Sequence, residues 1–150
     1  MTAAPRKILV TGSSGSLGAQ FVETFLTDGH AVVGFDIAPP TSDPGATSPD
    51  TAALGGAWRF VKCDVSDPAS IEQALAQVQD VFPFDIVFNN AGIAVGGPIA
   101  EMNPSDWEWT SKFDLSGPTH GGDAFLPPMT AQKHRGHLLL TAPFPVLGPH

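Results

Sequence analysis

Short apolar runs alternate with segments of helical periodicity along most of the chain. The apolar runs have the composition and length of strands, and they lie at Lys7–Val10, Ala31–Phe35, Trp58–Lys62, Asp85–Phe88 and His137–Leu140. Strands that alternate with helices form a parallel sheet covered on both faces. Right-handed crossovers place the first strand in the centre. We therefore expect an α/β fold with a doubly wound parallel sheet in the order 3-2-1-4-5.

Two helices are expected from periodic apolar positions and from start and stop signals. The first begins near Ser16 or Leu17 and stops at Asp28-Gly29, with an apolar face made of Leu17, Phe21, Val22, Phe25 and Leu26. The second is capped by Asp67 with Pro68 in its first turn, and its buried stripe is Ile71, Ala74, Leu75 and Val78. Between them, residues 38–56 have no hydrophobic period and predict a long surface loop.

A third helix is expected to start at Asn103, with Pro104 in its first turn, and to run through Trp107 toward Leu115. The segment 117–128, GPTHGGDAFLPP, is rich in helix breakers. A proline inside a helix costs about 3 kcal/mol and a glycine about 1 kcal/mol. We therefore expect this helix to end or kink near Gly117.

Composition excludes several classes of protein. The 150 residues suffice for one domain with a real core. A net charge of −8, with only seven Lys and Arg, argues against nucleic acid or an anionic membrane as partners. Cys63 is the only cysteine, which excludes a disulfide framework and a thiolate metal site; we interpret it as a small buried residue. No signal peptide or membrane span is recognisable, so a cytoplasmic location is expected.

The first strand leads into a glycine-spaced turn. Gly12, Gly15 and Gly18 follow the apolar run, and the second strand ends in Asp36. Glycines let the backbone approach a pyrophosphate, whose charge lies at a helix N-terminus. An acid at the end of the second strand can accept hydrogen bonds from an adenosine ribose. This combination of strand, turn, helix and acid predicts a dinucleotide site.

Four segments together resemble the short-chain dehydrogenase/reductase family. They are the turn Thr11–Gly18, Asp36 after the second strand, Asp64-Val65 after the third and Asn89-Asn90-Ala91-Gly92 after the fourth, within a resemblance that covers about residues 6–143. It implies a Rossmann-like fold and hydride transfer between a nicotinamide and an alcohol or carbonyl substrate. It also implies the following cofactor-binding residues: Gly12, Ser14, Gly15, Ser16, Leu17, Gly18, Asp36, Ile37, Asp64, Val65, Asn90, Ala91 and Gly92.

The implied cofactor is NAD, since Asp36 places a carboxylate where the 2′-phosphate of NADP would lie and Ile37 beside it is not basic. The glycine spacing TGxxGxxG is similar to the extended, epimerase-type branch of the family. Asn89–Gly92 and the segment around Trp107 are similar to the compact dehydrogenase branch.

The family's proton-transfer residues are not matched. The sequence contains no tyrosine, Asp114 replaces the relay Asn, and Pro143 stands at the position of the substrate-orienting Ser. The sequence ends at His150, before the segment that would carry the Tyr and Lys. We therefore expect a single dinucleotide-binding domain over 1–150 that is incomplete at the C-terminal side of the sheet. His120, His134 and His137 have no obvious partner and are interpreted as solvated or core residues.

Three interpretations stay open: an oxidoreductase of this family, a catalytically inactive NAD-binding module, and a truncated member without function. No catalytic residue and no metal ligand is assigned. The leucines of His137–Leu140 belong to a strand that is interior in the family. An uncovered apolar edge pairs with other chains, so we expect self-association through Pro104–Pro149 and not through the glycine turn.

Overall fold

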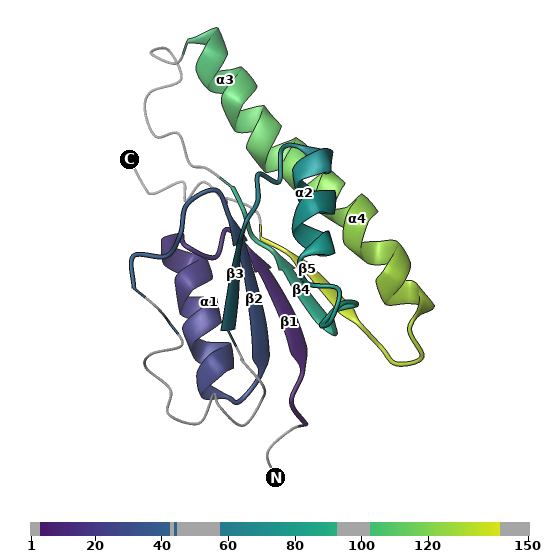
Figure 1. Ribbon diagram of the computed structural model, residues 1–150. Coiled ribbons are helices and arrows are strands. Elements are labelled where there is room, and N and C mark those ends of the chain that lie inside the picture. The colour runs from purple at the N-terminus through teal and green to yellow at the C-terminus, as the bar shows by residue number, and fades with distance from the viewer. Residues whose placement is uncertain (1–3, 43, 45–57, 93–102, 142–150) are drawn as a thin grey trace, which may run out of the picture.

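The computed structural model describes residues 4–42, 44, 58–92 and 103–141. Its five strands form one parallel sheet in the order β3-β2-β1-β4-β5, as predicted (Figure 1). The strands are β1 (Lys7–Thr11), β2 (Ala31–Asp36), β3 (Trp58–Lys62), β4 (Ile86–Asn89) and β5 (His137–Leu140). β1 and β2 each extend one residue beyond the predicted end, and β4 is shifted by one residue. Most of the loop expected at 38–56 lies outside the described residues.

The two faces of the sheet bury separate apolar clusters. Helix α1 (Ser16–Thr27) covers one face, where Ile8 and Val10 of β1 pack with Val22 and Leu26. The larger cluster lies on the other face, under α2 (Pro68–Ala76) and α4 (Gly117–Ala131), and includes Leu9. Successive strand residues point to opposite faces, which explains why neighbours in β1 belong to different clusters.

The first helix starts and stops where predicted, whereas the second starts where predicted but ends at Ala76, before Val78 of its predicted stripe. Asp67 caps α2, since its side chain accepts a hydrogen bond from the Ala69 N–H. The predicted face of α1 needs one correction, because Leu17 is 48% exposed. It lies in the first turn of the helix, next to the glycine turn and outside the cluster under α1. The predicted helical spacing of the apolar residues is correct, but the first turn of α1 does not pack on the sheet.

The third helix was expected to end or kink near Gly117; it does not end there, but its winding is irregular just before that residue. Helix α3 (Pro104–Ser111) begins with a capping box between Asn103 and Asp106. A π-helical segment, η4 (Lys112–Ser116), then leads directly into α4, which runs on to Ala131 (Figure 1). The irregularity expected from the sequence is therefore a widened turn within a helical stretch and not a break.

Close packing explains two of the three glycines of α4. A Cβ on Gly117 would lie 3.0 Å from Val65, and one on Gly121 would lie 2.5 Å from the Asn89 side chain. The missing side chains let the helix approach the sheet, and the contacts formed there offset the low helix propensity of glycine. None of the helices in the described part of the chain has the length and apolar character needed to cross a membrane.

Candidate functional site

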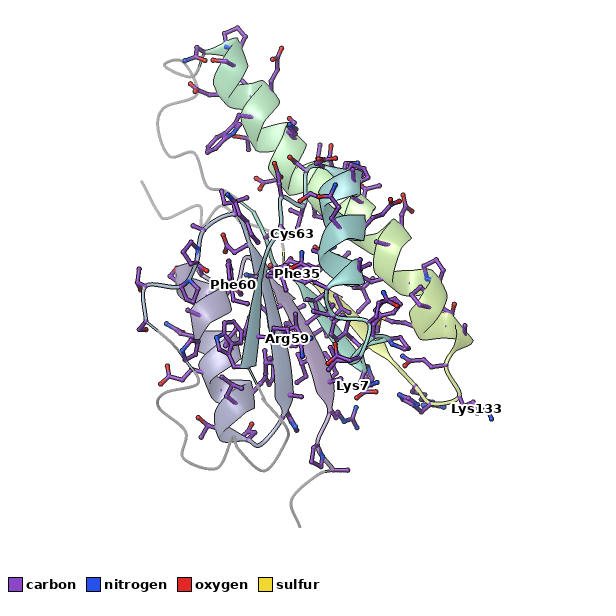
Figure 2. All side chains as sticks on the ribbon, viewed as in Figure 1. Lys7, Phe35, Arg59, Phe60, Cys63 and Lys133 are labelled. Carbon is purple, nitrogen blue, oxygen red and sulfur yellow. The ribbon has the colours of Figure 1, made fainter. Side chains whose placement is uncertain are left out.

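The predicted site residues meet at the carboxyl edge of the sheet. The glycine turn follows β1, Asp36 ends β2, and Asn90–Gly92 follow β4, so three neighbouring strands contribute to one edge. In Figure 2, Phe35 and Cys63 lie toward this edge, while Lys7 and Lys133 lie toward the opposite one. Doubly wound sheets bind ligands at the carboxyl ends of their strands, where the strand order reverses.

The three glycines of the turn meet different surroundings. Gly12 has a φ of +66° and its N–H donates to the Phe35 carbonyl at 2.8 Å. A Cβ on Gly18 would lie 1.9 Å from the Gly12 carbonyl oxygen, so the first turn of α1 packs directly on the loop. Gly15 is different: among the described residues, a Cβ there would meet only the Gly12 oxygen, at 3.4 Å. The fold itself requires glycine at Gly12 and Gly18 but not at Gly15.

The N-terminus of α1 has neither a capping side chain nor an acidic residue in its first turn. Its N-cap residue is Gly15. The first N–H groups of a helix have no intrahelical acceptor, and together with the helix dipole they attract an anion. An anion at this terminus would be stabilised by about 0.3–2 kcal/mol. The turn therefore provides a place for a phosphate group.

Asp36 is held rigidly beside this turn. Its carboxylate accepts hydrogen bonds from the Ser14 N–H at 2.9 Å and from the Ala38 N–H at 3.1 Å. The Ser14 hydroxyl donates to the Ala38 carbonyl at 2.7 Å, which closes the loop onto the turn. The carboxylate is thus fixed next to the start of the anion site. A ligand whose anionic group lay directly against the Asp36 carboxylate, and not at the helix terminus, would be repelled by it.

A groove of about 70 Å³ runs from Asp36 to Gly92. It brings together six predicted site residues and two others: Gly12, Asp36, Ile37, Val65, Ala91 and Gly92, with Phe35 and Cys63. Burial raises the pKa of the Cys63 thiol to about 11, so the thiol is neutral at physiological pH. The lining is mostly apolar, with Asp36 at one end, which suits a flat aromatic ring joined to a polar group.

Asp64 has a local partner instead of a place in the groove. Its carboxylate accepts hydrogen bonds from the Ser66 N–H at 2.9 Å and from the Ser66 hydroxyl at 2.6 Å. Its own N–H donates to the Ser70 hydroxyl. This arrangement shapes the turn between β3 and α2, and of the predicted pair Asp64-Val65 only Val65 lines the groove.

The sequence pattern missed the side chain that joins the two loops. The Thr11 hydroxyl accepts from the N–H groups of Asn90 and Ala91, both at 2.9 Å, and donates to the Asn89 side chain at 3.3 Å. The Asn90 amide in turn donates to the Thr11 carbonyl at 3.1 Å and accepts from the Thr141 hydroxyl at 3.0 Å. Threonine before the first glycine was the available signal, but its partners are about eighty residues away.

Two of the three candidate histidines, His120 and His134, have structural partners. His134 contacts the Asp85 carboxylate at 2.6 Å, and His120 contacts the Val65 carbonyl at 3.2 Å through Nδ1. Neither lines the groove. Among the residues that the structure places, no group of three or more His, Cys, Asp or Glu side chains could hold a metal ion. Pro143 lies outside the described residues.

Comparison with known protein families and curated proteins gives one consistent result. The family model described as short chain dehydrogenase matches residues 6–142. D-threitol dehydrogenase of Mycolicibacterium smegmatis is 33% identical over 110 residues, which are 73% of this chain and 42% of that protein. Galactitol 2-dehydrogenase of Agrobacterium fabrum is 30% identical over 132 residues, or 87% of this chain and 50% of that protein. The chain thus spans about half the length of the curated relatives it matches.

Solved structures show the same relationship. A short-chain dehydrogenase/reductase from Burkholderia phymatum in complex with NAD has a TM-score of 0.75 and 28% identity, and the match covers 95% of this chain and 50% of that one. A short chain dehydrogenase from Leptospira borgpetersenii with bound NAD+ has a TM-score of 0.76 at 20% identity, covering 91% and 50% of the two chains. The second likeness concerns the fold alone.

Proposed function

Because the chain belongs to the short-chain dehydrogenase family, we propose that it binds a nicotinamide dinucleotide at the carboxyl edge of its sheet and prefers NAD to NADP. The bound cofactor would supply a hydride acceptor for an alcohol or a hydride donor for a carbonyl. This chain's own residues would bind and orient it. The whole protein's activity would be the alcohol/carbonyl oxidoreduction of the family.

The observation that carries this proposal is the open space at Gly15. A glycine there has no reason inside the described fold, since the Gly12 oxygen is the one atom near the position that a Cβ would take. Gly15 stands at the uncapped N-terminus of α1, where an approaching phosphate would need that space. The pyrophosphate would lie on this terminus, and the groove toward Asp36 would take the adenosine.

The preference for NAD rests on Asp36. Its carboxylate would accept hydrogen bonds from the two ribose hydroxyls of NAD, but it would repel the 2′-phosphate of NADP. We expect NAD to bind more tightly on the order of a hundredfold. Titration of both cofactors by calorimetry tests this. The Asp36→Ala variant should bind NAD less tightly, and the difference between its affinities for NAD and NADP should be smaller than in the wild type. Equal affinity for both, or an equal loss of both in the variant, would contradict the assignment.

A pair of glycine variants tests the phosphate site separately. The backbone of Gly15 has φ −73° and ψ 167°, which alanine adopts freely. Gly15→Ala should therefore leave the thermal unfolding midpoint nearly unchanged and weaken NAD by about tenfold or more. Gly29→Ala, at the far end of α1, should lower stability because of its φ of +83° without changing the affinity of the folded protein. Full NAD affinity in Gly15→Ala would refute the phosphate site.

A second candidate is an NAD-binding module without turnover. Asp114, an acid at the relay position where the family has Asn, favours it. Positioned acid–base groups contribute roughly 10²–10⁴-fold to rates. We expect this chain to bind NAD but to show no sustained reduction of it with a panel of alcohols. Turnover that disappears in Asp114→Ala or His120→Ala would favour the enzyme instead.

A further inference from the structure

The sheet order determines where the second half of a bound dinucleotide must lie. Asp36 stands at the end of β2, on one side of the glycine turn, and Asn90–Gly92 follow β4, on the other side. If the adenosine lies at Asp36 and the pyrophosphate at α1, the nicotinamide half extends past Gly92 toward β5. This step rests on the proposed function. The side chains near Gly92 are therefore the ones that face the nicotinamide half.

A carboxylate lies directly beside that loop. An added Cβ on Gly92 would be 3.1 Å from Oδ1 of Asp114, a half-buried residue in η4. In the π-helical segment the backbone is wider than in an α-helix, and such bulges redirect side chains. Asp114 thus reaches the loop after β4 from a helix that is 22 residues further along the chain.

The helix that carries Asp114 is anchored to the sheet. The Asn89 side-chain amide donates to the Pro118 carbonyl at 3.0 Å, and Gly121 packs against the same side chain. Asn89 is buried at the end of β4, and its side-chain oxygen also accepts a hydrogen bond from the Thr11 hydroxyl. The start of α4 is therefore fixed relative to the loop, which keeps the backbone of η4, and with it Asp114, close to Gly92.

We propose that Asp114 makes this chain discriminate between the two redox states of its cofactor, binding the oxidised form in preference to the reduced form. The oxidised nicotinamide ring carries a positive charge, and the reduced ring carries none, while the rest of the dinucleotide is unchanged. A carboxylate near the ring therefore attracts NAD+ and has no comparable attraction for NADH. At separations of several ångströms and an effective dielectric constant between protein and water, the difference amounts to about threefold to tenfold in affinity.

The test compares binding constants of the 150-residue chain for NAD+ and NADH, by calorimetry and by NADH fluorescence. In Asp114→Asn the ratio of the two affinities should shift toward NADH by about threefold to tenfold, mainly because NAD+ binds less tightly. Asp123→Asn is the matched control, since it removes the same charge from α4, nine residues or roughly 13 Å further along the helix. It should leave the ratio unchanged. Binding constants are readable without any turnover.

A salt titration of the wild-type chain gives an independent reading that needs no variant. The preference for NAD+ should shrink as ionic strength rises, because the attraction is between charges that water partly screens. An unchanged ratio in a folded Asp114→Asn, an equal shift in Asp123→Asn, or a wild-type preference that is independent of salt would each overturn the inference while leaving cofactor binding intact. Failure of the wild-type chain to bind either form would overturn the proposed function, and this inference with it.

Discussion

Three glycines in the turn after β1 serve different purposes at the residue scale. Gly12 and Gly18 are required by the fold, through a positive φ and through direct contact with the loop, respectively. Gly15 is required only if a ligand approaches. The sequence predicts the turn and its ligand class from the glycines together with the flanking strand, helix and acid. It cannot separate these purposes, because they depend on which atoms lie nearby in three dimensions.

Side chains that join distant segments are likewise hidden from the sequence. Asp36 and the Asn90–Gly92 loop were predicted because each follows a recognisable strand. Thr11 and Thr141 were not, because their roles come only from hydrogen bonds to Asn90 across the edge of the sheet. Asp64 shows the opposite case: its place in the pattern suggests a ligand contact, while its carboxylate serves Ser66 in a local turn.

Cys63 gives a prediction about pH. Burial raises the pKa of its thiol from 9.0 to about 11, so below pH 9 the thiol is neutral in both the folded and the unfolded chain. Between pH 9 and about 11 only the unfolded chain loses the proton. The free energy of unfolding should therefore fall as pH rises through this window. Urea unfolding at several pH values measures this fall.

The control is Cys63→Ala, which should be less stable than the wild type at neutral pH. Its free energy of unfolding should also fall less steeply between pH 9 and 11 than that of the wild type. In the native wild-type chain at about pH 8, the thiol should also react slowly with a thiol reagent, and quickly once urea unfolds the chain. A fast reaction of the folded chain, or an identical slope in the two proteins, would contradict this account of the thiol.

At the scale of elements, propensity predicts how helices begin better than how they continue. Asn103 and Asp67 are local caps, and both were readable in the sequence. The helical continuation from Lys112 to Ala131 was not readable in the sequence. Its prolines and glycines lower the helix propensity, and tertiary packing compensates for that loss. Pro118 lies right after the π-helical segment, and its carbonyl accepts a hydrogen bond from the buried Asn89 side chain, one of the contacts that hold this stretch on the sheet.

Two adjacent glycines of α4 test this explanation. Gly121→Ala should destabilise the chain by about 1–3 kcal/mol, because the new methyl group would lie 2.5 Å from the buried Asn89 amide, which is already hydrogen-bonded. Gly122→Ala meets no described atom within 4 Å, so it should be neutral or stabilise by up to about 1 kcal/mol through helix propensity. Denaturant unfolding of both variants decides. Equal effects would mean that α4 does not need its close approach to β4.

For the whole molecule, the alternation of strands and helices was enough to predict the sheet. All five strands lie within one residue of their predicted bounds, and their order follows from the handedness of the crossovers. The pattern could not show how well the last strand is covered. In the described part of the chain, β5 pairs with β4 alone, and Leu139 and Leu140 are 41% and 60% exposed.

This open edge leads to a prediction about association. A strand with free backbone groups and exposed leucines can pair with the same strand of another copy, whereas the glycine turn lies at the ends of the strands and offers no such edge. We expect the chain to self-associate through β5. Sedimentation at several concentrations should show oligomers, and Leu139→Lys should shift them toward monomer because charged side chains block edge pairing.

Leu17→Lys, which changes a similarly exposed leucine beside the glycine turn, is the matched control and should leave the oligomers unchanged. A monodisperse monomer at all concentrations, or equal effects of the two lysines, would show that β5 does not mediate association.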